Sequence, residues 1–73
     1  MEETEINKVQ KKLGATIRNI REEKDQYSQS KLAVEIGMSV NQVARIERGE
    51  TNPTVKTLTL IAKALMVDIK DLF

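Results

Sequence analysis

A chain of 73 residues has room for one small domain, which would bury only about 60% of its unfolded surface. It contains neither cysteine nor histidine, so disulfides and thiolate metal sites are excluded and the commonest general base and metal ligand are missing. The charges nearly balance at a net +1, and no apolar run approaches the length of a membrane span. We therefore expect no metal, no cofactor, no membrane partner and no enzymatic activity.

The first predicted element is a helix, because its apolar residues recur at three- and four-residue steps: Ile6, Val9, Leu13, Ile17 and Ile20. Gly14 interrupts this stripe at a cost of about 1 kcal/mol relative to alanine, so it marks either close packing or the true start of the globular helix. The charged residues 22–25 end the stripe. Residues 1–10 are expected to form an N-terminal arm or a helix extension, and residues 11–73 the folded domain. The first residues, MEETEINK, lack the apolar region of a signal peptide, so a cytoplasmic location is expected.

Further short helices follow, each with its own start and stop signals. Ser28, Ser39 and Thr54 can cap helices over 29–36, 40–48 and 55–66, and Asp68 can cap a last turn over 69–73. Gly37 and Gly49 can adopt the positive φ that ends a helix, and Asn52–Pro53 forms a turn. The pattern predicts an all-α protein, with five short helices around one core and no strand.

Only three residues, Gly37 to Ser39, join the second and third predicted helices. So short a turn makes the two helices cross steeply, which is the helix-turn-helix arrangement. It requires a small residue at the crossing point (Ala33), positive φ at Gly37, and apolar residues that seat the third helix (Val43 and Ile46). All of these are present at the required spacing.

With these residues the sequence resembles the phage Cro and repressor (XRE-like) type of helix-turn-helix regulator, over Leu13 to Phe73. The segments IERG at 46–49, NP at 52–53 and LIAKAL at 60–65 are particularly typical, whereas the link KDQY at 24–27 is one residue longer than usual. The resemblance implies a compact lambda-repressor-like DNA-binding domain. In size the chain is similar to the controller proteins of restriction–modification systems, and phage repressors and antitoxins are the other subclasses that it could belong to.

The outer face of the third predicted helix would then read DNA, because a recognition helix points its N-terminal residues at base edges in the major groove. Asn41 can pair bidentately with adenine and Arg45 with guanine, while Val40 and Ala44 can touch thymine methyl groups. The alternative for this face is ordinary solvation. Contacts with the DNA backbone, which position the protein without reading sequence, are expected from Ser28, Gln29, Ser39, Gln42, Arg48, Asn52, Thr54 and Lys56.

Glu47 is out of place on such a helix, since phosphate would repel it. The resemblance implies that it faces inward and pairs with a basic residue of the first helix, Arg21 or, as the alternative, Arg18. A partly buried pair of this kind fixes geometry more surely than it adds stability.

Family members usually bind as two-fold dimers with recognition helices about 34 Å apart. The expected interface is the apolar C-terminal part of the chain, although Leu72 and Phe73 could instead close the monomer core: Leu65, Met66, Val67, Ile69, Leu72 and Phe73. The expected function is therefore sequence-specific regulation of transcription by a homodimer on a (pseudo)palindromic operator. The alternative is an antitoxin-like protein-interaction module of the same fold. RNA polymerase or a toxin could be a further partner, and no small-molecule ligand is expected.

Overall fold

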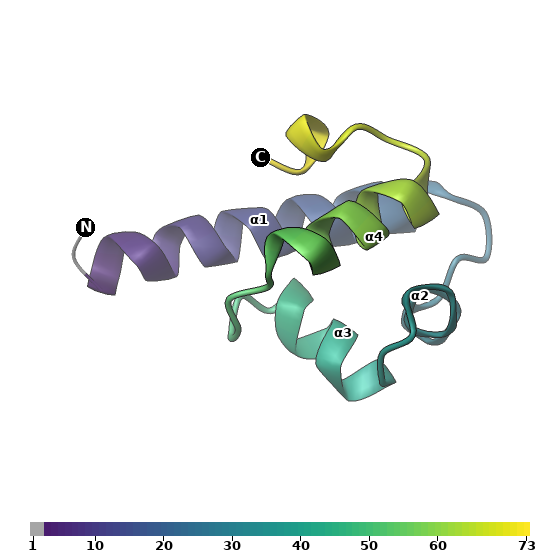
Figure 1. The fold of residues 1–73 in the computed structure, drawn as a ribbon, viewed down its shortest axis with the longest axis horizontal. Coiled ribbons are helices and arrows are strands. Elements are labelled where there is room, and N and C mark those ends of the chain that lie inside the picture. Colours follow the sequence, from purple (N-terminus) through teal and green to yellow (C-terminus); the bar gives the residue numbers. More distant parts are fainter. Residues whose placement is uncertain (1–2) are drawn as a thin grey trace.

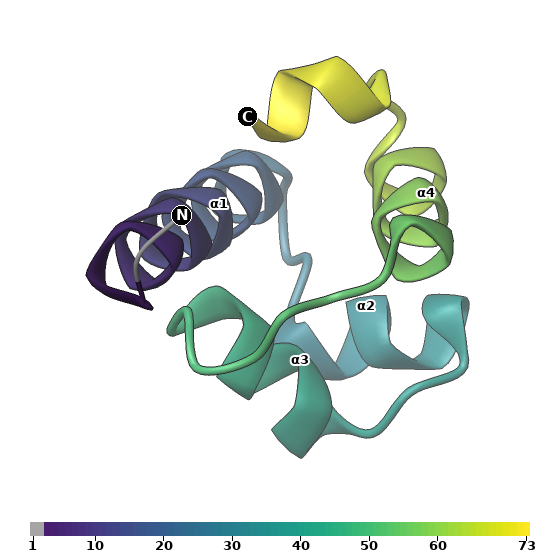
Figure 2. The same cartoon turned by 60° about the vertical axis from the view of Figure 1, so that its left-hand side comes forward.

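The computed structural model describes residues 3–73, which form four α-helices and one short 3₁₀ helix without any strand in that range. The elements in chain order are α1 (Glu3–Glu23), α2 (Gln29–Ile36), α3 (Val40–Glu47), α4 (Val55–Leu65) and η1 (Ile69–Leu72). In Figures 1 and 2 α2 and α3 form the lower side of the molecule, and α1, α4 and η1 lie above them. The prediction of an all-α fold is confirmed.

The prediction of five α-helices is wrong at its last member. The turn after Asp68 spans only four residues, and its backbone bonds join residues three apart, as in Asp71 N–H to Asp68 C=O at 2.9 Å. Short single turns often take this tighter 3₁₀ form. It still serves its packing role, because Leu72 is fully buried.

The first helix is longer than the part of it that packs. It runs unbroken for 21 residues from Glu3, so the described part of the predicted arm is a helix extension, while residues 1–2 lie outside the described residues. Leu13 and Ile17 are buried, but Ile6 and Val9, which belong to the same apolar stripe, are 38% and 48% exposed. Figure 1 gives the reason, since the N-terminal turns of α1 extend past the other elements.

The core is aliphatic and receives side chains from every helix. Its buried members are Leu13, Ile17, Leu32, Ala33, Ile36, Val43, Ile46, Leu58, Ile61, Ala62, Leu65 and Leu72. Tyr27 packs against this core from the link between α1 and α2. In that link Gln26 takes a positive φ of 54°, which is where the longer connection makes its turn.

The helix ends follow the predicted signals closely. The hydroxyls of Ser28, Ser39 and Thr54 each accept a hydrogen bond from a backbone N–H three residues later. Two ends differ by one residue, because α3 stops at Glu47 and α4 at Leu65. Met66, at φ 62°, has a left-handed backbone that cannot continue α4.

Candidate DNA-binding surface

The turn between α2 and α3 is built as the sequence requires. Gly37 takes a φ of 72°, and the N–H of Met38 donates to the carbonyl of Ala33 at 2.9 Å. Ala33, Val43 and Ile46 are at most 4% exposed, so the small residue lies in the contact and the apolar residues seat α3. The two helices therefore form a helix-turn-helix unit.

The opposite side of α3 is accessible to solvent over most of its length. Asn41 and Arg45 are exposed, Val40 is 43% exposed, and Ala44 is partly exposed between them. Figures 1 and 2 show this side of α3 at the lower edge, uncovered by any other element. The four residues predicted to contact bases thus share one accessible surface.

A buried charged network holds α3 to the other two helices. Arg21 Nε and Nη2 donate to the two carboxylate oxygens of Glu47 at 2.7 and 3.1 Å, and Gln29 Nε2 donates to one of them at 2.9 Å. The side chains of Arg21 and Glu47 are 9% and 1% exposed. The Glu47 hydrogen bond is the main reason that the pKa of Arg21 is raised above its ordinary value, so the guanidinium stays charged. Arg18, the alternative partner, instead contacts Glu22 at 3.3 Å.

The helix α1 reaches its contact with α3 through a glycine. A Cβ on Gly14 would lie 2.6 Å from the carbonyl oxygen of Glu47 and closer still to that of Ile46. Of the two sequence interpretations of Gly14, the structure shows close packing. This close approach brings Arg21, two turns further along α1, within reach of Glu47.

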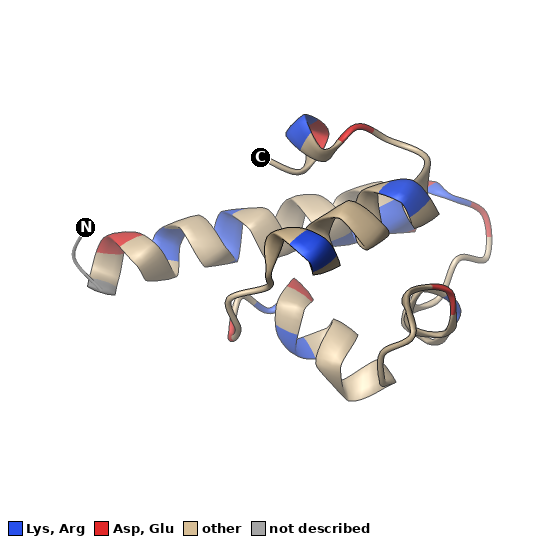
Figure 3. Ribbon diagram, in the orientation of Figure 1, with Lys and Arg blue, Asp and Glu red and all other residues tan. Residues whose placement is uncertain are grey.

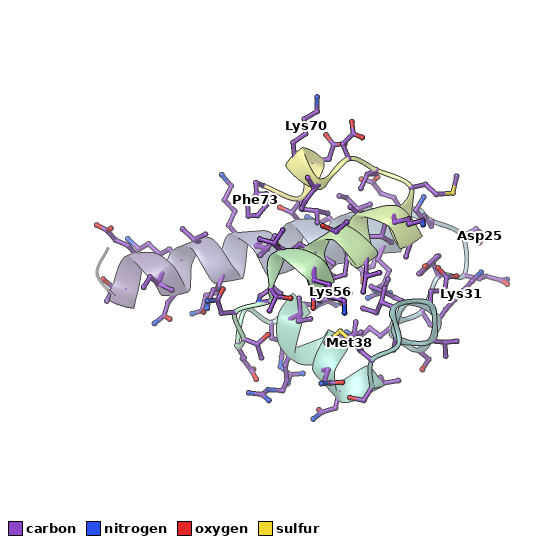
Figure 4. All side chains as sticks on the ribbon, in the orientation of Figure 1. Asp25, Lys31, Met38, Lys56, Lys70 and Phe73 are labelled. Carbon is purple, nitrogen blue, oxygen red and sulfur yellow. The ribbon has the colours of Figure 1, made fainter. Side chains whose placement is uncertain are left out.

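Most of the residues predicted to contact the DNA backbone line two shallow concavities on either side of α3, whereas Ser39 and Lys56 line neither of them. The first, between α1, α2 and α3, is lined by Arg18, Arg21, Ser28, Gln29, Ser30, Val40, Ala44 and Arg48. The second, between α3 and the start of α4, is lined by Met38, Gln42, Ile46, Thr51, Asn52, Pro53, Thr54 and Thr57. Figure 4 shows Lys56 and Met38 in the region between α4 and α3.

Two details of these concavities were not expected from the sequence. Arg18 lines the first one, although it was considered only as a partner for Glu47; its position one turn before Arg21 on α1 is the signal that could have indicated it. Ser39 and Gln42 cap each other, with Gln42 Oε1 accepting from the Ser39 N–H at 2.9 Å. These two side chains are therefore already engaged at the start of α3.

Directly after α3 one exposed arginine is paired with a nearby glutamate. Arg48 contacts Glu50 at 2.7 Å, and the two side chains are about half exposed, at 52% and 49%. The hydrogen bond from Arg48 lowers the pKa of Glu50 below its ordinary value, and the charge of Arg45 adds to this. Figure 3 shows basic and acidic segments close together along α3 and the loop after it.

The predicted dimer surface divides into core and surface residues. Leu65 and Leu72 are fully buried in the monomer, so their assignment to the interface is wrong: their side chains pack against the other helices of the same chain. Val67 is partly buried against the core, whereas Met66, Phe73 and Ile69 are 83%, 62% and 38% exposed. In Figure 4 Phe73 lies beside η1, on the side of the molecule away from α3.

Between residues 3 and 73 no cluster of three or more acidic, histidine or cysteine side chains is placed to hold a metal ion. Nor does any of the described helices have the length and apolar character needed to cross a membrane.

These observations define a helix-turn-helix protein: α2 and α3 are joined by a short turn, the buried Arg21–Glu47 ion pair holds α3 in place, and the outer face of α3 is accessible. The sequence profile described as "Helix-turn-helix" matches residues 17–72, and the chain therefore belongs to the helix-turn-helix family, of the Cro/repressor (XRE) type.

Individual relatives are regulators and controllers. The chain is 38% identical over 66 residues to the control protein C.BamHI of Bacillus amyloliquefaciens. The aligned region covers 90% of this chain and 82% of that protein. It is 42% identical over 62 residues to the HTH-type transcriptional regulator SlrR of Bacillus subtilis, covering 84% of this chain but only 40% of SlrR. The restriction–modification controller protein C.AhdI from Aeromonas hydrophila has a similar structure, with a TM-score of 0.85 and 29% identity over 90% of this chain and 98% of that one.

Proposed function

We propose that this protein regulates transcription by binding double-stranded DNA sequence-specifically through the exposed face of α3. The observation that carries the proposal is the accessible set Val40, Asn41, Ala44 and Arg45, held outward by the buried Arg21–Glu47 pair. Membership of the helix-turn-helix family and the names of its relatives, which are regulators and control proteins, support the same function.

Roles within the surface follow from side-chain chemistry. The Asn41 amide matches adenine and the Arg45 guanidinium matches guanine in the major groove, and Val40 and Ala44 offer methyl contacts to thymine. Polar groups of the two flanking concavities, with Arg18 added to the expected set, would contact the phosphates on either side of the groove.

Selection of bound sequences from random duplex DNA tests this proposal and would report half-site, spacing and symmetry together. Asn41→Ala and Arg45→Ala should each weaken binding to the selected site by about 5- to 150-fold, which corresponds to about 1–3 kcal/mol per lost base contact. Lys70→Ala is the control, because Lys70 lies on η1 on the far side of the molecule from α3 (Figure 4). If the selection enriches no sequence, the chain is better explained as a protein-interaction module.

We propose further that two copies associate through the exposed C-terminal side chains Met66, Ile69 and Phe73, which would leave both α3 faces free to bind a palindromic operator. Phe73→Asp should shift the protein from dimer to monomer in sedimentation at micromolar concentration, with helix content unchanged. Val34→Asp is the matched control, because Val34 is 81% exposed on α2, which lies on the opposite side of the molecule from η1 (Figure 1). A folded Phe73→Asp variant that stays dimeric would exclude this interface.

A further inference from the structure

The chain reverses direction directly after α3 and places an acidic side chain over its last turn. Gly49 takes a φ of 74°, and the Glu50 N–H then donates to the carbonyl of Arg45 at 2.9 Å. This C-terminal closure of the helix fixes the backbone of Glu50 next to Arg45 and Arg48. A carboxylate therefore lies among the cations of the surface that is proposed to meet DNA phosphates.

Glu50 holds Arg48 at two points. Arg48 Nε donates to Oε2 of Glu50 at 2.7 Å, and Nη2 donates to Oε1 at 3.3 Å. A phosphate group is also bound by arginine through two parallel N–H bonds, so it would need the same donors. Because both side chains are about half exposed, the pair contributes little to folding, and its position calls for another explanation.

We propose that Glu50 is an internal competitor of DNA phosphate for Arg48. In the free protein the Glu50 carboxylate accepts two hydrogen bonds from the Arg48 guanidinium. DNA of any sequence has to displace this carboxylate before Arg48 can bind a phosphate. Glu50 thereby limits the affinity that the surface has for the DNA backbone, which supplies essentially all of non-specific binding. This inference rests on the proposed DNA-binding function.

The effect of Glu50 is measured with a fluorescent duplex of random sequence, titrated with protein at salt concentrations from 50 to 200 mM. We expect Glu50→Gln to bind about two- to fivefold more tightly than the wild type at the lowest salt, the range set by the strength of an exposed ion pair. The slope of log K against log salt should steepen by up to about 0.9, the value of one additional phosphate contact. The melting temperature should stay unchanged.

Two sets of variants separate the competitor role from a general charge effect. Asp71→Asn changes the net charge by the same amount on η1, on the opposite side from α3, and its amide can still accept the hydrogen bond from the Asp68 N–H. It should leave the affinity unchanged. In an Arg48→Gln background the gain from Glu50→Gln should largely disappear, because the cation that it frees is absent.

The inference is overturned if Glu50→Gln binds no more tightly than the wild type, if Asp71→Asn produces an equal gain, or if the full gain persists without Arg48. These outcomes are distinct from failure of the proposed function. A wild type without sequence preference in the selection experiment contradicts sequence-specific regulation, whereas the titrations use DNA of random sequence and report only on Glu50.

Discussion

Removal of the Glu47 carboxylate should destabilise the fold severely. Glu47→Ala deletes the acceptor of two bonds from Arg21 and one from Gln29. Among the described residues, the buried Arg21 guanidinium then keeps one hydrogen-bond acceptor, the Tyr27 carbonyl at 2.8 Å. Breaking a buried ion pair on one side costs about 3–5 kcal/mol. A chain of this length has a total stability of about 4–11 kcal/mol, so the variant loses from a quarter to all of it.

The assay is thermal and urea unfolding followed by circular dichroism at a helix-sensitive wavelength. For a domain of this size the loss corresponds to a drop of about 12–40 °C in melting temperature. The companion variant removes both charges, as Arg21→Met with Glu47→Leu, and should recover most of the lost stability because no unpaired charge is left in the core. An unchanged melting temperature in Glu47→Ala would refute the reasoning, as would a double variant no more stable than the single one.

Three further predictions concern α1 and the link that follows it. Gly14→Ala should lower stability by about 1–3 kcal/mol in thermal unfolding, because the new Cβ has no room against the backbone of Ile46 and Glu47. This loss is expected although alanine favours a helix by about 1 kcal/mol relative to glycine. An equally stable variant would contradict the close contact. Burial, with a hydrogen bond to Glu35, raises the pKa of Tyr27 from 10.0 to about 12. The stabilisation from this environment is therefore complete below pH 10 and is lost as the pH rises toward 12. Absorbance of this single tyrosine near 295 nm should report a midpoint near 12, lower in Glu35→Gln, and a native midpoint near 10 would be inconsistent with it. Gln26→Gly should raise the free energy of unfolding by up to about 1 kcal/mol in urea titrations, because glycine adopts the observed φ of 54° without strain, and a less stable variant would show that the side chain matters more than the backbone.

Features that depend on a few neighbouring residues could be predicted from the sequence. The caps at Ser28, Ser39 and Thr54 and the turn at Gly37 are local, since each requires a particular residue type at a fixed distance from the helix end. The ends of α3 and α4 were placed one residue late. In both cases the residue taken as the last helical one, Arg48 or Met66, is the one that closes the helix.

Features that depend on what lies opposite an apolar side chain could not be predicted with the same certainty. Periodicity places Ile6 and Val9 on the same face of α1 as Leu13. It does not say how far along α1 the other helices pack against that face, and both Ile6 and Val9 lie in the part that they leave exposed. The same difficulty affects the C-terminal part of the chain. Leu72 closes the core while Phe73, the next residue, remains mostly exposed, and only the path of η1 over the other helices distinguishes them.

The Arg21–Glu47 ion pair fixes the orientation of α3 in the fold as well as contributing to stability. The helix α3 has eight residues and buries only two aliphatic side chains, Val43 and Ile46. Apolar packing is non-directional, so two such contacts allow the helix some rotation about its axis. The two-point bond between Arg21 and Glu47 has a fixed geometry, and Gln29 adds a third point from α2. A carboxylate on the inner side of α3 thus fixes the direction in which Asn41 and Arg45, the side chains proposed to read bases, point.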